Sequence, residues 1–200
     1  MKIKNKFLRE YIKDIKNGVI PKVAPPPIRE VGFDELSARS TICDTGLWVK
    51  ISQKYFTDLL PFIADNKVLE VMAGAGWFGK GLSELGVTIH CTDDFSWQED
   101  GAHNNLNMVH PIEKLEATVA VEKYKDQFDM LLISWPPYGD ETILKICKEW
   151  GSAKPILYIG EEGGCNAPET FFEKFQCRDI LYTEQWVGIH DNVLIGYYID

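Results

Sequence analysis

A glycine-rich turn between an apolar strand and a helix constrains this chain more than any other stretch of its sequence. Residues 68–86 read VLEVMAGAGWFGKGLSELG, with an apolar run before the turn and helix-forming residues after it. Glycines at such a turn let the backbone approach a ligand closely, and the first turn of the following helix offers unpaired N–H groups. The stretch therefore predicts a strand, a ligand-binding turn and a helix in succession.

From residue 67 onward, apolar runs of strand length alternate with segments of helical periodicity. This alternation predicts a three-layer α/β domain with a seven-stranded, mostly parallel sheet. The connection between the last two strands is too short for a crossover helix, so these strands should form an antiparallel hairpin at the C-terminus. The expected strands are 68–72, 88–92, 107–110, 128–134, 156–160, 179–183 and 192–199. The expected helices are 77–85, 113–124, 142–150 and 168–175.

The chain before the first strand is expected to be a helical N-terminal extension. Apolar residues at helical spacing within Phe7–Ile15 predict an amphipathic helix. Pro21–Arg39 contains three consecutive prolines and reads as an extended linker. A second helix is expected over Trp48–Phe62, capped near Asp44–Thr45. Near the other end of the chain, Asn166 is expected to cap the helix at 168–175.

Composition narrows the class of protein. A chain of 200 residues with 45% apolar content is typical of one soluble globular domain. No run approaches the ~20 apolar residues that span a bilayer, and the lysine-rich start lacks a secretory signal, so we expect a cytoplasmic protein without membrane contact. The five cysteines are scattered without CxxC spacing, so we expect neither disulfides nor a metal site. The sequence leaves the oligomeric state open.

The net charge of −9 argues against nucleic acid as a partner, because binding phosphate backbones requires basic surfaces. The charge is uneven, since the first 22 residues hold seven basic side chains and two acidic ones. A basic arm that touches RNA or a membrane surface is one interpretation of this segment. The other, which we favour, is a solvated helix face.

The glycine turn has more than one interpretation. Gly74, Gly76 and Gly79 match the GxGxxG dinucleotide fingerprint, with Asp93 placed to bind a ribose, which would indicate an NAD-dependent oxidoreductase. Glu70 favours another interpretation, because a carboxylate inside the first strand suits a cationic ligand and would repel a pyrophosphate. A third interpretation is that the glycines only form a tight turn.

The segment Val68–Gly76 resembles motif I of the class I S-adenosylmethionine-dependent methyltransferases. The resemblance extends over about residues 67–200 and implies a Rossmann-like fold with S-adenosylmethionine as cofactor. In that family the acid on the first strand serves the cofactor's ammonium, and the acid that ends the second strand binds the ribose. Met72 departs from the motif, which has a glycine there. By this resemblance the cofactor-binding residues are Glu70, Met72, Ala73, Gly74, Ala75, Gly76, Asp93, Asp94, Glu116, Ala117 and Ser134.

The tetrapeptide Trp135-Pro-Pro-Tyr138 resembles a second motif of the same fold. Amino-methyltransferases carry Asn or Asp, two prolines and an aromatic residue after the fourth strand, where they hold the target amine. Here Trp135 replaces the polar residue, and its indole is a hydrogen-bond donor only. The residues proposed on this basis for catalysis or acceptor binding are Trp135, Pro136, Tyr138 and Glu161. The alternative for Trp135 is a place in the core.

The sequence thus predicts an S-adenosylmethionine-dependent methyltransferase whose acceptor is a small molecule or a protein side chain. Two alternatives stay open, an NAD-dependent oxidoreductase and a methyltransferase-like module that binds without catalysis. We divide the chain into the extension, residues 1–66, and a cofactor-binding domain, residues 67–200. By resemblance to small methyltransferases, residues 33–48 are candidates for a lid over the active site. The alternative is that the helix at 48–63 only covers one face of the sheet.

Overall fold

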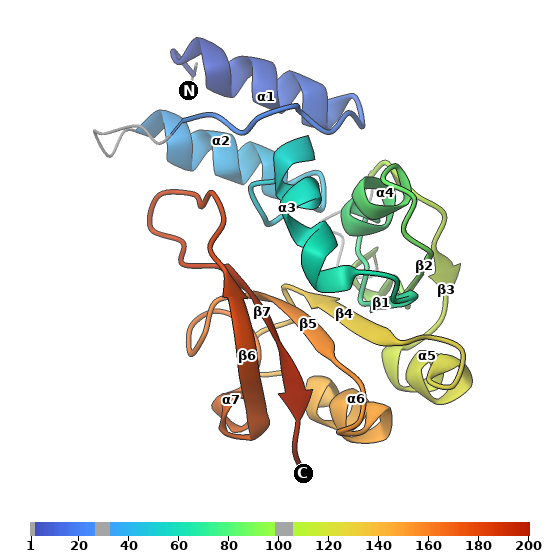
Figure 1. Ribbon diagram of the computed structural model, residues 1–200. Helices are drawn as coiled ribbons and strands as arrows, with labels where there is room; N and C mark the ends of the chain where they lie inside the picture. Colours follow the sequence, from blue (N-terminus) through green and yellow to red (C-terminus); the bar gives the residue numbers. More distant parts are fainter. Residues whose placement is uncertain (1–2, 27–32, 99–105) are drawn as a thin grey trace.

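The computed structural model describes residues 3–26, 33–98 and 106–200 (Figure 1). Seven strands form one sheet in the order β3-β2-β1-β4-β5-β7-β6. The strands are β1 Val68–Val71, β2 Ile89–Asp93, β3 Glu113–Lys114, β4 Met130–Ser134, β5 Ile156–Gly160, β6 Phe175–Leu181 and β7 Asn192–Tyr198. The helices are α1 Lys6–Lys16, α2 Phe33–Cys43, α3 Gln53–Ile63, α4 Trp77–Ser83, α5 Ala117–Tyr124, α6 Thr142–Trp150 and α7 Glu169–Lys174, with a 3₁₀ turn, η1, at Ser96–Gln98.

The strand pairing confirms the expected fold class. Strands β1 to β5 pair in parallel, while β7 lies antiparallel between β5 and β6. The chain order therefore reverses direction at β1, which has β2 on one side and β4 on the other. In open α/β sheets, ligands bind at the carboxyl ends of the strands beside such a switch point.

Alternating side chains along the central strands build two cores, one on each face of the sheet. On β4, Met130 and Leu132 face the helices α1, α3 and α4, whereas Leu131 and Ile133 face α5, α6 and α7. Figure 1 shows these two groups of helices on opposite sides of the sheet. Because both faces are covered, the central strands read as continuous apolar runs instead of alternating ones.

The prediction of an extended linker over 21–39 is wrong in its second part, where α2 begins at Phe33; residues 27–32 lie outside the described residues. The buried positions of α2 are Glu35, Ala38, Ile42 and Cys43. Only one of them is a large apolar residue, so hydrophobic periodicity gives little sign of the helix. The extension thus contains three helices in its described part.

The predicted start of the next helix is also wrong. Helix α3 begins after Ser52, whose hydroxyl accepts a hydrogen bond from the Tyr55 N–H at 3.1 Å. Thr45 and Gly46 instead end α2: the Thr45 hydroxyl donates to the Ile42 carbonyl, and Gly46 has φ +73°. Residues with cap chemistry occur at both ends of helices, which is why the earlier pair was assigned to the wrong helix.

The expected strand at 107–110 is absent from the described residues, and β3 is the short segment Glu113–Lys114, which was predicted as the start of a helix. Helix α5 begins later because the Glu116 carboxylate caps it, accepting hydrogen bonds from the N–H groups of Thr118 and Val119. The register Thr92↔Glu113 then places Glu116 just beyond the carboxyl end of β2.

Asn166 does not cap α7, whose N-cap residue is Pro168. The Asn166 side chain instead accepts from the Glu161 N–H at 2.8 Å and donates to the Pro136 carbonyl at 3.4 Å, so it ties together the loops after β4 and β5. Strand β6 follows α7 directly, several residues earlier than predicted. Within the described ranges no helix is both long and apolar enough to cross a membrane.

Candidate functional site

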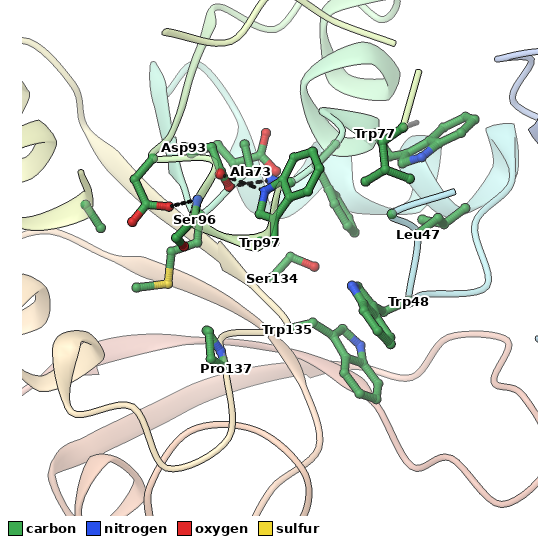
Figure 2. A pocket seen from close by; sticks show the side chains of 18 of the residues that line it. Leu47, Trp48, Ala73, Trp77, Asp93, Ser96, Trp97, Ser134, Trp135 and Pro137 are labelled. Carbon is green, nitrogen blue, oxygen red and sulfur yellow. Dashed lines mark hydrogen bonds between the residues drawn. The ribbon is translucent and has the colours of Figure 1, made fainter. Parts of the chain in front are cut away.

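A cavity of about 380 Å³ lies at the carboxyl ends of β1, β2 and β4 (Figure 2). Nine of the eleven residues predicted to bind a cofactor line it; their role stays a prediction. Ala75 and Gly76 do not line the cavity. The lining residues are Gly46, Leu47, Trp48, Val49, Glu70, Met72, Ala73, Gly74, Trp77, Phe78, Asp93, Asp94, Ser96, Trp97, Leu106, Glu116, Ala117, Ser134, Trp135, Pro137, Asp140 and Thr142.

The glycine turn is held by two hydrogen bonds to the end of β2. The Ala73 N–H donates to the Thr92 carbonyl at 3.1 Å, and the Gly74 N–H donates to Asp93 Oδ2 at 2.8 Å. Gly76 has φ +85°, and a Cβ at this position would lie 2.9 Å from the Cβ of His110. Gly76 thus lets the segment around His110 pack closely against the turn, which explains its place outside the cavity lining.

Three strand ends beside the cavity carry a non-glycine residue with positive φ. Met72 follows β1 at φ +55°, Phe95 follows β2 at φ +60°, and Trp135 follows β4 at φ +48°. Side chains with a Cβ occupy this left-handed region at a cost of about 1–2 kcal/mol each. Such strain gathers at sites where a side chain must hold a particular direction.

We expect Met72→Gly to be more stable than Met72→Ala by about 1 kcal/mol, because glycine relieves the positive φ and alanine does not. Both variants remove the same side chain from the cavity, so packing losses cancel in the comparison. Urea denaturation of the two proteins measures the difference. Equal midpoints would show that Met72 carries no backbone strain.

Glu70 is the most deeply buried carboxylate of the cavity, with 1% of its surface exposed. The Cys91 thiol donates to its Oε2 at 3.0 Å. Burial raises the pKa of Glu70 to about 8, although hydrogen bonds from Cys91 and the Gly79 N–H oppose the shift. A cation brought next to Glu70 would favour its ionised form, so this carboxyl group is a ready partner for a positively charged ligand.

Asp93 organises the loop after β2. Its carboxylate accepts three hydrogen bonds, from the N–H groups of Gly74 and Phe95 at 2.8 Å and from the indole N–H of Trp97 at 3.0 Å. The neighbouring Asp94 is exposed and accepts from the Ser96 N–H at 2.8 Å. Asp93 therefore fixes the cavity wall, and Asp94 presents the more accessible carboxylate to a ligand.

Only some of the candidates for catalysis line the cavity. Trp135 and the neighbouring Ser134 line the cavity, whereas Pro136, Tyr138 and Glu161 do not. The Pro136 carbonyl accepts from Asn166, Tyr138 is 77% exposed, and the Glu161 carboxylate accepts from the His190 N–H at 2.8 Å. Of the tetrapeptide, Trp135 and Pro137 therefore line the cavity, and its role in acceptor binding stays a prediction.

The N-terminal extension contributes wall residues to the cavity, three of them within residues 33–48, the segment predicted as a candidate lid; that role stays a prediction. Gly46, Leu47, Trp48 and Val49 line the cavity, and the Trp48 ring is stacked on Trp135 with centroids 6.2 Å apart (Figure 2). These residues precede α3, although the sequence placed Trp48 inside a helix.

The cavity is acidic and aromatic. Five of its lining residues are acids, four are tryptophans, and none of its described lining residues is lysine, arginine or histidine. Carboxylates and indole faces both attract cations. The chemistry of this lining therefore favours a ligand with positive charge and disfavours a pyrophosphate.

Comparison with known proteins shows the fold of the chain. No family model and no curated protein matches it. A mutant of MtNAS is similar in structure, with a TM-score of 0.51 and 10% identity over 96% of this chain and 71% of that one. The magnesium protoporphyrin IX methyltransferase ChlM from Synechocystis PCC 6803, with bound SAM, also has a TM-score of 0.51, at 8% identity over 86% of each chain. The chain therefore has the Rossmann-like fold of the class I methyltransferases.

Proposed function

We propose that this protein is an S-adenosylmethionine-dependent methyltransferase. The observation that carries the proposal is the buried carboxylate of Glu70 beneath a glycine turn, in a cavity whose described lining holds no basic side chain. S-adenosylmethionine carries an ammonium and a sulfonium, and both would meet carboxylates or indole rings here. The similarity in fold to ChlM, which was crystallised with SAM, supports the same choice.

The proposed reaction is an in-line displacement. A nucleophilic atom of the acceptor forms a bond to the methyl carbon, the C–S bond breaks with its electron pair staying on sulfur, and the proton of the nucleophile passes to water. Positioning and exclusion of water supply most of the rate in such a step. Trp48 and Trp135 would supply that exclusion, because both rings lie on the cavity wall.

Calorimetry with S-adenosylhomocysteine and with NAD tests the proposal. We expect saturable binding of S-adenosylhomocysteine and none of NAD, since the pyrophosphate of NAD would lie beside Glu70. Binding of NAD alone would refute the methyltransferase assignment. If the donor binds but cell extract contains no acceptor for a radiolabelled methyl group, the non-catalytic module becomes the better description; the place of Pro136, Tyr138 and Glu161 outside the cavity lining favours that alternative.

A further inference from the structure

Five buried side-chain atoms lack a hydrogen-bond partner among the described residues, and all of them lie on α2, α3 or the loop before β7. Leaving such an atom unpaired destabilises a protein, so a group of them in one part of the chain requires a cause. These atoms are Glu35 Oε2, Arg39 Nε, the Tyr55 hydroxyl oxygen, Trp186 Nε1 and Asp191 Oδ1.

Asp191 connects this group to the cavity through Trp135. Asp191 is 2% exposed, and its Oδ2 accepts from the indole N–H of Trp135 at 3.3 Å. The guanidinium carbon of Arg39 lies 5.5 Å from the centroid of the same indole ring. Trp135 thus lines the cavity and also contacts two charged side chains, Asp191 through its indole N–H and Arg39 over its ring.

The unpaired atoms near Trp135 differ in the hydrogen-bond partner that they require. Asp191 Oδ1 needs a hydrogen-bond donor, and Arg39 Nε needs an acceptor. No ion pair joins Arg39 to Asp191 in the described part of the chain, so the two groups do not satisfy one another. The Tyr55 hydroxyl lies within the electrostatic reach of Asp191, and burial followed by that charge raises the pKa of Tyr55.

A ligand with a single charge would leave part of this group unpaired. A simple amine would satisfy Asp191 but not Arg39, and a simple carboxylate would do the reverse. A molecule that carries an ammonium and a carboxylate on the same carbon satisfies both, with charge-assisted hydrogen bonds to each group. Arg39 and Asp191 together therefore suit a zwitterionic ligand.

We propose that Arg39 and Asp191, beside Trp135, form the acceptor subsite, and that the methyl acceptor is a free amino acid whose ammonium pairs with Asp191 and whose carboxylate pairs with Arg39. This inference rests on the proposed methyltransferase function. Trp135 has to turn aside for the acceptor to meet the donor.

Ligand-observed saturation-transfer NMR tests the subsite directly. The protein is saturated with S-adenosylhomocysteine, and the twenty standard L-amino acids are added as a pool. We expect transfer to the resonances of one or a few of them. The decarboxylated amine and the deaminated acid that correspond to each bound amino acid are then tested, and both should bind at least tenfold more weakly.

Two variants assign the contacts. Asp191→Asn and Arg39→Gln should each weaken amino-acid binding at least tenfold, while the affinity for S-adenosylhomocysteine changes less than twofold. Arg39→Gln should also abolish the preference for the amino acid over its decarboxylated amine, which a loss of stability alone would not do. Asp179→Asn and Arg178→Gln, on the exposed face of β6, are the matched controls and should bind like the wild-type protein.

The outcomes separate the two proposals. Binding of S-adenosylhomocysteine without binding of any amino acid would overturn the acceptor subsite and leave the methyltransferase assignment standing. The buried atoms would then be satisfied by internal water. Equal binding of the amino acid and its decarboxylated amine would also overturn it. Failure to bind S-adenosylhomocysteine would instead contradict the proposed function, whatever the amino acids do.

Discussion

At pH 8, Glu70→Gln is expected to raise the thermal stability of the free protein and to weaken S-adenosylmethionine binding at least a hundredfold. The glutamine keeps an oxygen that accepts from Cys91 and Gly79, but it carries no charge. The wild-type carboxyl group is 1% exposed, and burial raises its pKa to about 8. Removing the charge therefore removes a cost of folding together with a partner for the donor's ammonium, as stability and function often conflict at such sites.

The pH dependence of this effect has a definite sign. Below about pH 4.5 Glu70 is protonated in both the folded and the unfolded chain, so the wild type and the variant should be equally stable. Between pH 4.5 and 8 the unfolded carboxyl group ionises while the folded one stays largely protonated, so wild-type stability falls as the pH rises. Each unit of pKa shift corresponds to about 1.4 kcal/mol, so the difference at pH 8 amounts to several kcal/mol.

Thermal denaturation of both proteins between pH 4.5 and pH 8.5 measures this dependence. Glu113→Gln is an informative control, because hydrogen bonds from Lys123, Tyr124 and His90 lower the pKa of Glu113 to about 2. Its contribution should be present above pH 4.5 and fade as the pH falls, opposite to that of Glu70. A Glu70→Gln advantage that does not change with pH would show that the folded carboxyl group titrates normally.

The second large effect is expected from Gly81→Ala, which should destabilise the protein by about 1–3 kcal/mol through overpacking. Gly81 lies on α4, and a Cβ there would come within 2.4 Å of the Phe56 ring on α3. The ring has little room to move, since it is 1% exposed and packs edge-on against Tyr55 and Phe78. The clash therefore falls on the contact between the N-terminal extension and the sheet domain.

Combining Gly81→Ala with Phe56→Leu should recover part of the loss, because the smaller side chain makes space for the methyl group. Urea denaturation followed by fluorescence and by circular dichroism gives the stabilities of the single and double variants. Gly86→Ala is a poor comparison because Gly86 has φ +85°, so Ser83→Ala at the exposed end of α4 serves as control. Strict additivity of the two changes would contradict the predicted contact.

The sheet domain was predictable because its signals are local. Helix α6 and strand β5 have the predicted bounds, since each has a strong apolar pattern between clear ends. The hairpin of β6 and β7 followed from the length of one connection. Nine of the cofactor candidates line one cavity for a similar reason, because residues that end parallel strands meet at one edge of the sheet; their role stays a prediction.

The surroundings of Trp135 were not predictable from sequence, because they depend on contacts between distant segments. Asn166 read as a helix cap, yet its amide holds the Pro136 carbonyl 30 positions away. Asp191 gave no signal at all, and its relation to Trp135 spans 56 positions. Helix α2 was missed since its buried face consists mainly of small and charged residues, which only a tertiary partner makes favourable.

The lack of basic side chains in the described cavity lining has a consequence for turnover. Methyl transfer converts a sulfonium into a neutral thioether, so the donor loses one positive charge during the reaction while the surrounding carboxylates keep theirs. An acidic cavity therefore holds the spent cofactor less firmly than the fresh one, and this difference should shrink as ionic strength rises. Under the proposed function, the charge of the cavity alone would therefore favour release of S-adenosylhomocysteine and limit product inhibition.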